Sequence, residues 1–127
     1  SVCTTSTHDM TPLRNWWKED PEKTQRYYNH VLQRIGEAPD ECTAEIVAQI
    51  ISNHLKTRSM LTIIPLQDWF AMDDSIKRKD IESERINVPA NSTHYWRYRM
   101  HITLEQLLQA DNLNNKIVSL IKEAGRK

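Results

Sequence analysis

Glycine and cysteine are both scarce in this sequence, and their scarcity excludes several kinds of site. Glycine occurs only at Gly36 and Gly125, whereas nucleotide-binding fingerprints need closely spaced glycines that let the backbone approach phosphates. The sequence therefore encodes no ATP or NAD site of that type. Cys3 and Cys42 are far apart, which excludes a disulfide framework or a zinc knuckle. A reducing, cytoplasmic location is the simplest expectation.

Long apolar runs and an excess of one charge are also missing. The longest apolar stretch, residues 60–65, is far shorter than the roughly 20 residues that cross a bilayer. Lys plus Arg and Asp plus Glu number 17 each, so the formal net charge is zero. The short apolar stretch predicts no membrane span. Because phosphate neutralisation supplies most non-specific affinity for nucleic acid, the zero net charge also predicts no nucleic-acid partner.

The histidines and serines lack the spacing of familiar catalytic motifs. His8, His30, His54, His94 and His101 are scattered and form no His-Glu-x-x-His pattern, so we predict no metal site. No serine stands between glycines, which excludes the strained elbow of a Ser-His-Asp hydrolase.

The apolar pattern predicts an α/β chain that is mostly helical by residue count. Residues 2–7 are uncharged and rich in β-branched side chains, which predicts a short strand that ends in a loop. Residues 60–64 form a continuous apolar run, which suits a parallel strand covered by helices on both faces. Helical spacing predicts a helix from the Asp20 cap to Gly36, a second opening at Asp40, and a last one capped by Asp111. Thr103 and Gln106 resemble a capping box ahead of a further apolar stretch at 104–108. Residues 71–94 read as a long loop. We find no internal domain boundary in 1–127.

Two strands cannot by themselves form a sheet that buries both faces. At 127 residues the chain is also too short for a complete α/β barrel of about 250 residues. The remaining strands are therefore expected from an upstream portion or from another copy, and the isolated chain is expected to self-associate.

Two clusters are candidates for function, and each has a plainer interpretation. His8-Asp9 follows the first strand, where barrels place catalytic groups, although polar residues are common at solvated strand ends. Residues 95–99 alternate aromatic and basic side chains, a pattern that stacks on bases or sugars. The same pattern also arises when aromatic rings pack beneath Arg stems.

Four motifs together resemble one enzyme family. They are STHDM at 6–10, PLQDW at 65–69, ERINVP at 84–89 and HYWRYR at 94–99, with WWKED at 16–20. In order and spacing they are similar to the C-terminal end of the amylomaltase-type 4-alpha-glucanotransferases of glycoside hydrolase family 77. The resemblance implies the C-terminal fragment of a (β/α)8 barrel, with residues 2–7 as its seventh strand and 60–64 as its eighth.

The resemblance also implies roles for individual residues in a retaining transfer between α-1,4-glucans or maltooligosaccharides. Asp9 would be a transition-state stabiliser and His8 would bind the sugar at the cleavage point. The other implied substrate-binding residues are Gln67, Asp68, Arg85, Asn87 and Trp96, and for Asp68 a helix-capping role is an equally open alternative. No cofactor is implied. The family's nucleophile and acid/base lie on earlier strands, so the fragment alone is expected to be inactive.

A second class of function stays open at this point. A small binding module could use residues 95–99 on RNA, single-stranded DNA or a protein partner. Zero net charge disfavours the nucleic-acid version.

Overall fold

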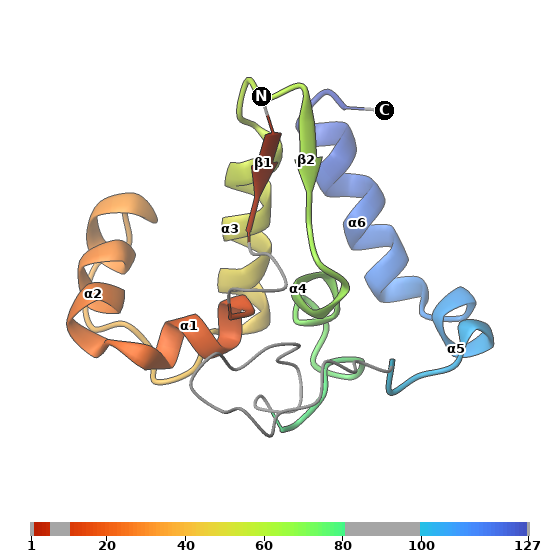
Figure 1. The fold of residues 1–127 in the computed structure, drawn as a ribbon, viewed down its shortest axis with the longest axis horizontal. Helices are drawn as coiled ribbons and strands as arrows, with labels where there is room; N and C mark the ends of the chain where they lie inside the picture. Colours follow the sequence, from red (N-terminus) through yellow and green to blue (C-terminus); the bar gives the residue numbers. More distant parts are fainter. Residues whose placement is uncertain (1, 6–10, 81–99, 127) are drawn as a thin grey trace, which may run out of the picture.

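The computed structural model describes residues 2–5, 11–80 and 100–126, and its centre is a two-stranded parallel sheet. Strand β1 spans Val2–Thr4 and strand β2 spans Leu61–Ile63. Val2 pairs with Leu61 and Thr4 with Ile63. Because the strands are parallel, their carboxyl ends lie at the same edge (Figure 1). The predicted parallel α/β unit is confirmed, although both strands are shorter in the structure than the apolar runs suggested.

Helices make up most of the described chain and follow the strands in order. They are α1 (Leu13–Glu19), α2 (Pro21–Arg26), the π-helix η1 (Tyr27–Val31), α3 (Ala44–Leu55), α4 (Leu66–Phe70), α5 (Leu104–Leu108) and α6 (Asp111–Glu123). Helix α3 runs beside β1, while α1 and α4 lie near the carboxyl ends of the two strands (Figure 1). This edge therefore gathers segments that are far apart in the sequence.

Helix α2 begins where the sequence predicted but ends earlier. The Asp20 carboxylate accepts hydrogen bonds from the backbone N–H groups of Glu22 and Lys23 at 3.1 and 3.3 Å. The predicted continuation to Gly36 is wrong, because η1 ends at Val31 and Gln33 takes a φ of 55°. A positive φ stops a right-handed helix. Ile35, which fitted the helical spacing, is consequently 98% exposed.

The predicted start of α3 is also wrong by a few positions. Asp40 does not open the helix; the N-cap is Thr43, whose hydroxyl accepts from the Ile46 backbone N–H at 3.3 Å. Asp and Thr are both good N-caps, so composition alone could not choose between them. The predicted apolar face is confirmed, since Ile46 and Ile50 are each 1% exposed.

The C-terminal helices follow their predicted signals closely. Thr103 and Gln106 form the expected capping box of α5. Asp111 was predicted to cap α6, but Ala110 is the N-cap and Asp111 is the first helical residue, where its negative charge still favours the helix dipole. Residues 71–80 form turns, as the predicted loop required, and residues 81–94 lie outside the described residues.

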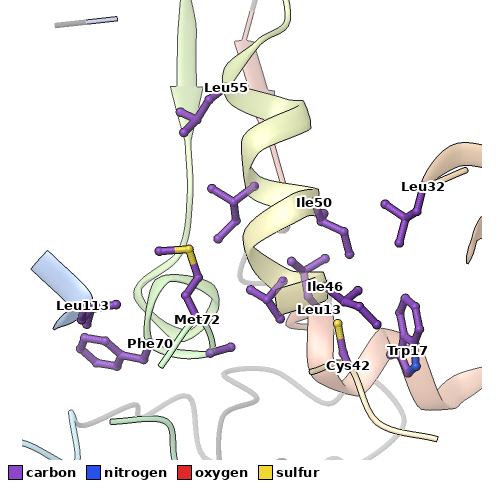
Figure 2. Close-up of a cluster of buried hydrophobic side chains, with 13 residues drawn as sticks. Leu13, Trp17, Leu32, Cys42, Ile46, Ile50, Leu55, Phe70, Met72 and Leu113 are labelled. Carbon is purple, nitrogen blue, oxygen red and sulfur yellow. The ribbon is translucent and has the colours of Figure 1, made fainter. Parts of the chain in front are cut away.

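The hydrophobic core lies on both sides of α3. Figure 2 shows Trp17, Leu32 and Cys42 on one side of this helix and Phe70, Met72 and Leu113 on the other. Trp17 is 2% exposed and its indole N–H donates to the Pro39 carbonyl at 2.8 Å. A buried indole needs such a partner.

One face of the sheet is left uncovered by the described helices. Alternate residues of a strand point to the same face, and Val2, Leu61 and Ile63 on this face are 63%, 52% and 51% exposed. Exposed apolar patches on paired strands mark an interaction surface. The fold therefore presents an apolar sheet face that other segments would cover.

Candidate active-site edge

Asp68 joins the two strand ends at one edge of the sheet. It is 1% exposed. Its Oδ2 accepts a hydrogen bond from the Thr5 hydroxyl at 2.5 Å, and its Oδ1 accepts from the Leu13 backbone N–H at 2.9 Å. Thr5 follows β1, Leu13 begins α1, and Asp68 lies in α4. The PLQDW motif therefore contacts residues on both sides of the STHDM motif.

The local sequence explains why this carboxylate points inward. Pro65 is the N-cap of α4 and follows β2 closely, and a proline fixes φ near the value that starts a helix. Gln67 and Asp68 in the first turn are 7% and 1% exposed. A buried carboxylate is tolerated only when donors satisfy it. Thr5 and Leu13 supply such donors.

The capping alternative for Asp68, in which it would cap its own short helix, is wrong, because α4 has no side-chain cap and Asp68 lies in its first turn. The carboxylate accepts from the backbone N–H of Leu13, the first residue of α1. It thus serves the start of α1, a helix distant in sequence, whereas the expectation had been a cap made through its neighbours' backbone N–H groups.

Cys42 lies in the core beside this edge and its thiol is held protonated. Burial, and after it the nearby negative charge of Asp68, raise the pKa of Cys42 to about 12. Arg14 and Lys77 act in the opposite direction but are outweighed. Burial also raises the pKa of the Tyr27 hydroxyl, with Cys42 as the second cause. Neither group is an anion at neutral pH.

We expect the free energy of unfolding to fall at alkaline pH because of Cys42. Its folded-state pKa of about 12 exceeds the ordinary value of 9.0, so between these pH values the unfolded chain loses a proton that the folded chain keeps. The contribution of the Cys42 thiol to the free energy of unfolding is fully present below pH 9.0. Above pH 9.0 this contribution declines by about 1.4 kcal/mol per pH unit. Urea unfolding measured on either side of pH 9.0 checks this.

The matched control is Cys42→Ala, which removes the titrating group. Its unfolding free energy should depend less steeply on pH over the same range. If the unfolding free energy fell equally steeply with pH in the two proteins, Cys42 would have its ordinary pKa in the folded chain.

A small cavity lies next to Thr5. It has a volume of about 160 Å³ and is lined by Thr5, Thr11, Leu13, Trp16, Tyr27, Ile50 and His54. Trp16 and Tyr27 meet edge to face, with ring centroids 5.2 Å apart. Its lining comes from Thr5 and Thr11, from α1, from η1 and from α3.

The structure brings together only part of the predicted site. Gln67 and Asp68 lie at the strand edge, whereas His8, Asp9, Arg85, Asn87 and Trp96 lie outside the described residues, as does the aromatic and basic cluster at 95–99. The roles of all seven stay predictions. Sequence reasoning missed Thr5 as a partner of Asp68. Its place directly before the STHDM motif was the only signal for it.

Two kinds of feature are absent from the described ranges. Within residues 2–5, 11–80 and 100–126, no group of three or more His, Cys, Asp and Glu side chains is placed to hold a metal ion. No helix in the same part of the chain has the length and apolarity needed to span a bilayer.

The fold and this edge together define a class of protein. Parallel strands whose carboxyl ends meet polar side chains, with helices outside, are the construction of α/β domains that place their sites at that edge. The chain is a piece of such a domain.

Comparison with known sequences identifies the family. The sequence profile of glycoside hydrolase family 77, 4-alpha-glucanotransferase, matches residues 1–105. The chain is 39% identical over 126 residues to the 4-alpha-glucanotransferase DPE2 of Oryza sativa subsp. japonica, and 31% identical over 123 residues to a 4-alpha-glucanotransferase of Chlamydia trachomatis. The chain belongs to the family of 4-alpha-glucanotransferases.

The chain covers only a small part of these relatives. The matched region spans 99% of this chain but 13% of the rice protein, and 94% of this chain but 22% of the chlamydial protein. The amylomaltase from Streptococcus agalactiae in complex with acarbose has the same fold over 22% of its chain, with a TM-score of 0.71 at 18% identity. That match covers 99% of this chain.

Proposed function

We propose that this chain is the part of a 4-alpha-glucanotransferase barrel that contains its seventh and eighth strands, β1 and β2. Parallel pairing, an uncovered apolar sheet face and similarity to less than a quarter of an amylomaltase chain support the proposal. The observation that carries it is the Thr5–Asp68 hydrogen bond of 2.5 Å. Through it, the PLQDW motif of the family contacts the residue directly before the STHDM motif, at the edge where barrels place their active sites.

In this function Asp9 stabilises the transition state and His8 binds the sugar at the cleavage point. A retaining transfer passes through an oxocarbenium-like state, so a carboxylate that holds the ring hydroxyls lowers the barrier as positive charge develops. Gln67, in the first turn of α4, is assigned to binding of the same substrate, as are Arg85, Asn87 and Trp96. The residues are assigned by their match to the family's motifs.

The substrates are α-1,4-glucans or maltooligosaccharides, which donate and accept glucan segments. The names of the relatives and the acarbose complex of the streptococcal amylomaltase support this class of ligand. Residues 95–99 fall within the range matched by the family, which favours the transferase over a separate nucleic-acid or protein-binding module.

Residues 1–127 supply neither the nucleophile nor the general acid/base in this proposal. The family carries its nucleophilic Asp and its acid/base Glu on earlier barrel strands, and the chain resembles the part that follows them. Asp9 is then the one member of the catalytic carboxylate set found here.

A full-length chimera tests the proposed function. In it, residues 1–127 replace the matching segment of the rice protein. We expect the chimera to convert maltotriose into longer and shorter maltooligosaccharides, and the rice protein cut off before this segment to be inactive. A folded chimera that binds single-stranded RNA on a filter at low salt but transfers no glucan would contradict the proposal.

The isolated 127-residue chain should self-associate. Its uncovered sheet face and strand edges have no described partner segment, and such surfaces pair readily with another copy. Light scattering should show a mass that rises with concentration. Replacing Leu61 and Ile63, which are about half exposed, with lysine should reduce the association, whereas Leu108→Lys on α5 should not. A monomer at every concentration would contradict the expectation.

A further inference from the structure

A polar cleft lies between the turn that follows α4 and helix α5. Its volume is about 570 Å³. The side chains that line it include Asp73, Ser75 and Ile76 of the turn, and Ile102, Gln106 and Gln109 of α5 and its flanks. Helix α5 lies at the end of the molecule toward which both strands run (Figure 1). The cleft is therefore on the same side of the fold as the candidate active-site edge.

Asp73 is the buried polar residue of this cleft, with 7% of its surface exposed. Its Oδ1 accepts hydrogen bonds from the backbone N–H of Ser75 at 2.9 Å and from the Ser75 hydroxyl at 2.6 Å. No residue in the described ranges donates a hydrogen bond to its Oδ2. Because a buried carboxylate oxygen needs a donor, Oδ2 requires one from a ligand or from water.

The other lining groups suit a ligand that is rich in hydroxyls. The Gln106 Oε1 accepts from the Thr103 backbone N–H at 2.7 Å, which holds the side chain and leaves its amide NH2 free to donate. Gln109 is exposed and offers a second amide. Ile76 and Ile102 add apolar surface on which the C–H groups of a sugar ring can pack. Carboxylate, amide and apolar groups together match a sugar better than an anion.

We propose that this cleft is an accessory binding site for a glucan chain, in which Asp73 accepts hydrogen bonds from sugar hydroxyls. The choice of a glucan as the ligand rests on the proposed function, whereas the hydroxyl-binding character rests on the cleft itself. A long glucan held here and at the active site would bind more tightly than at either site alone.

Binding of amylose by the full-length chimera tests this inference. Asp73→Asn keeps an oxygen for the two bonds from Ser75, but it replaces Oδ2 with an amide NH2 and removes the charge. We expect the dissociation constant for amylose, measured by retardation in native gels, to rise by about tenfold. Because maltotriose is too short to occupy both sites at once, its kcat and KM should stay within about twofold.

The matched control is Asp74→Asn. Asp74 is the adjacent aspartate, but it is exposed, pairs with Lys77 at 2.7 Å and lines a different groove. Its substitution should leave the dissociation constant for amylose within about twofold. Gln109→Ala, at an exposed position, should raise that constant by about threefold. Melting temperatures show whether each variant is folded, and Gln109→Ala decides the matter if Asp73→Asn does not fold.

The same proteins distinguish failure of this inference from failure of the proposed function. If the chimera transfers glucan from maltotriose but the folded variants bind amylose as tightly as the unchanged chimera, the accessory site is wrong and the proposed function stands. If the chimera transfers no glucan, yet its retardation by amylose depends on Asp73 and Gln109, the cleft binds glucan and the proposed function is wrong.

Discussion

Asp9→Asn in the full-length chimera should lower kcat and kcat/KM together, by about a hundred- to a thousandfold. Asparagine keeps the size of the side chain and part of its hydrogen bonding but loses the negative charge. The interaction that disappears is therefore the one that strengthens as positive charge develops on the sugar ring. KM should change little. Steady-state kinetics with maltotriose as donor and glucose as acceptor measure both constants.

The matched control for this substitution is Asp111→Asn. Asp111 is an exposed aspartate at the start of α6, a helix that packs against α3, and we place it outside the site. Its substitution should leave kcat within about twofold, as surface substitutions usually do. If Asp9→Asn raised KM alone, Asp9 would bind ground state and transition state equally, and its assigned role would be wrong.

The isolated 127-residue chain should show no glucan transfer at all. A lone stabiliser cannot begin a covalent displacement, because the sugar must be attacked by one carboxylate while another protonates the leaving oxygen. Incubation with maltotriose, followed by chromatography of the sugars, should show only the starting material. The full-length chimera assayed alongside is the positive control.

Turnover by the pure chain would contradict the proposed function in either of two ways. Turnover that persists after Asp9→Asn would require a complete catalytic set elsewhere in residues 1–127. Turnover that Asp9→Asn abolishes would instead give Asp9 the role of nucleophile, and the assignment of that role to an upstream strand would fail.

The parts of the fold that the sequence predicted well depend on local patterns. The β-branched stretch at 2–7 and the apolar run at 60–64 located both strands, and their parallel pairing followed from the helices between them. Asp20 and Thr103 were correctly identified as caps, since a cap and its N–H partners are close in sequence. Such features depend on neighbours within a few positions.

The predictions that failed depended on contacts between distant residues or on choices between equal local signals. Thr43 rather than Asp40 caps α3, although both side chains can accept the same hydrogen bond. The helix after Asp20 stops at η1, where Gln25 and Asn29 side chains hydrogen-bond to the Gly36 carbonyl and hold the following loop. No local rule ranks these alternatives.

In the candidate site, too, local sequence located individual residues but not the contacts between distant ones. Gln67 and Asp68 were found from a short motif, but the partner of Asp68 is Thr5, which is 63 positions away. Sequence patterns could place both residues at strand ends. They could not show that the carboxylate is buried and committed to protein donors, because this depends on how α4 packs against the end of β1.

The central claim is that residues 1–127 hold a stabilising carboxylate of a 4-alpha-glucanotransferase and not its nucleophile. Covalent trapping in the full-length chimera tests it most directly. A fluorinated glucosyl fluoride that forms a slowly hydrolysed glycosyl–enzyme leaves its sugar on the nucleophile, and mass spectrometry of the peptides locates it. The account predicts that the labelled carboxylate lies upstream of residue 1, with peptides from residues 1–127 unmodified. A sugar attached to Asp9 or to Asp68 would contradict it.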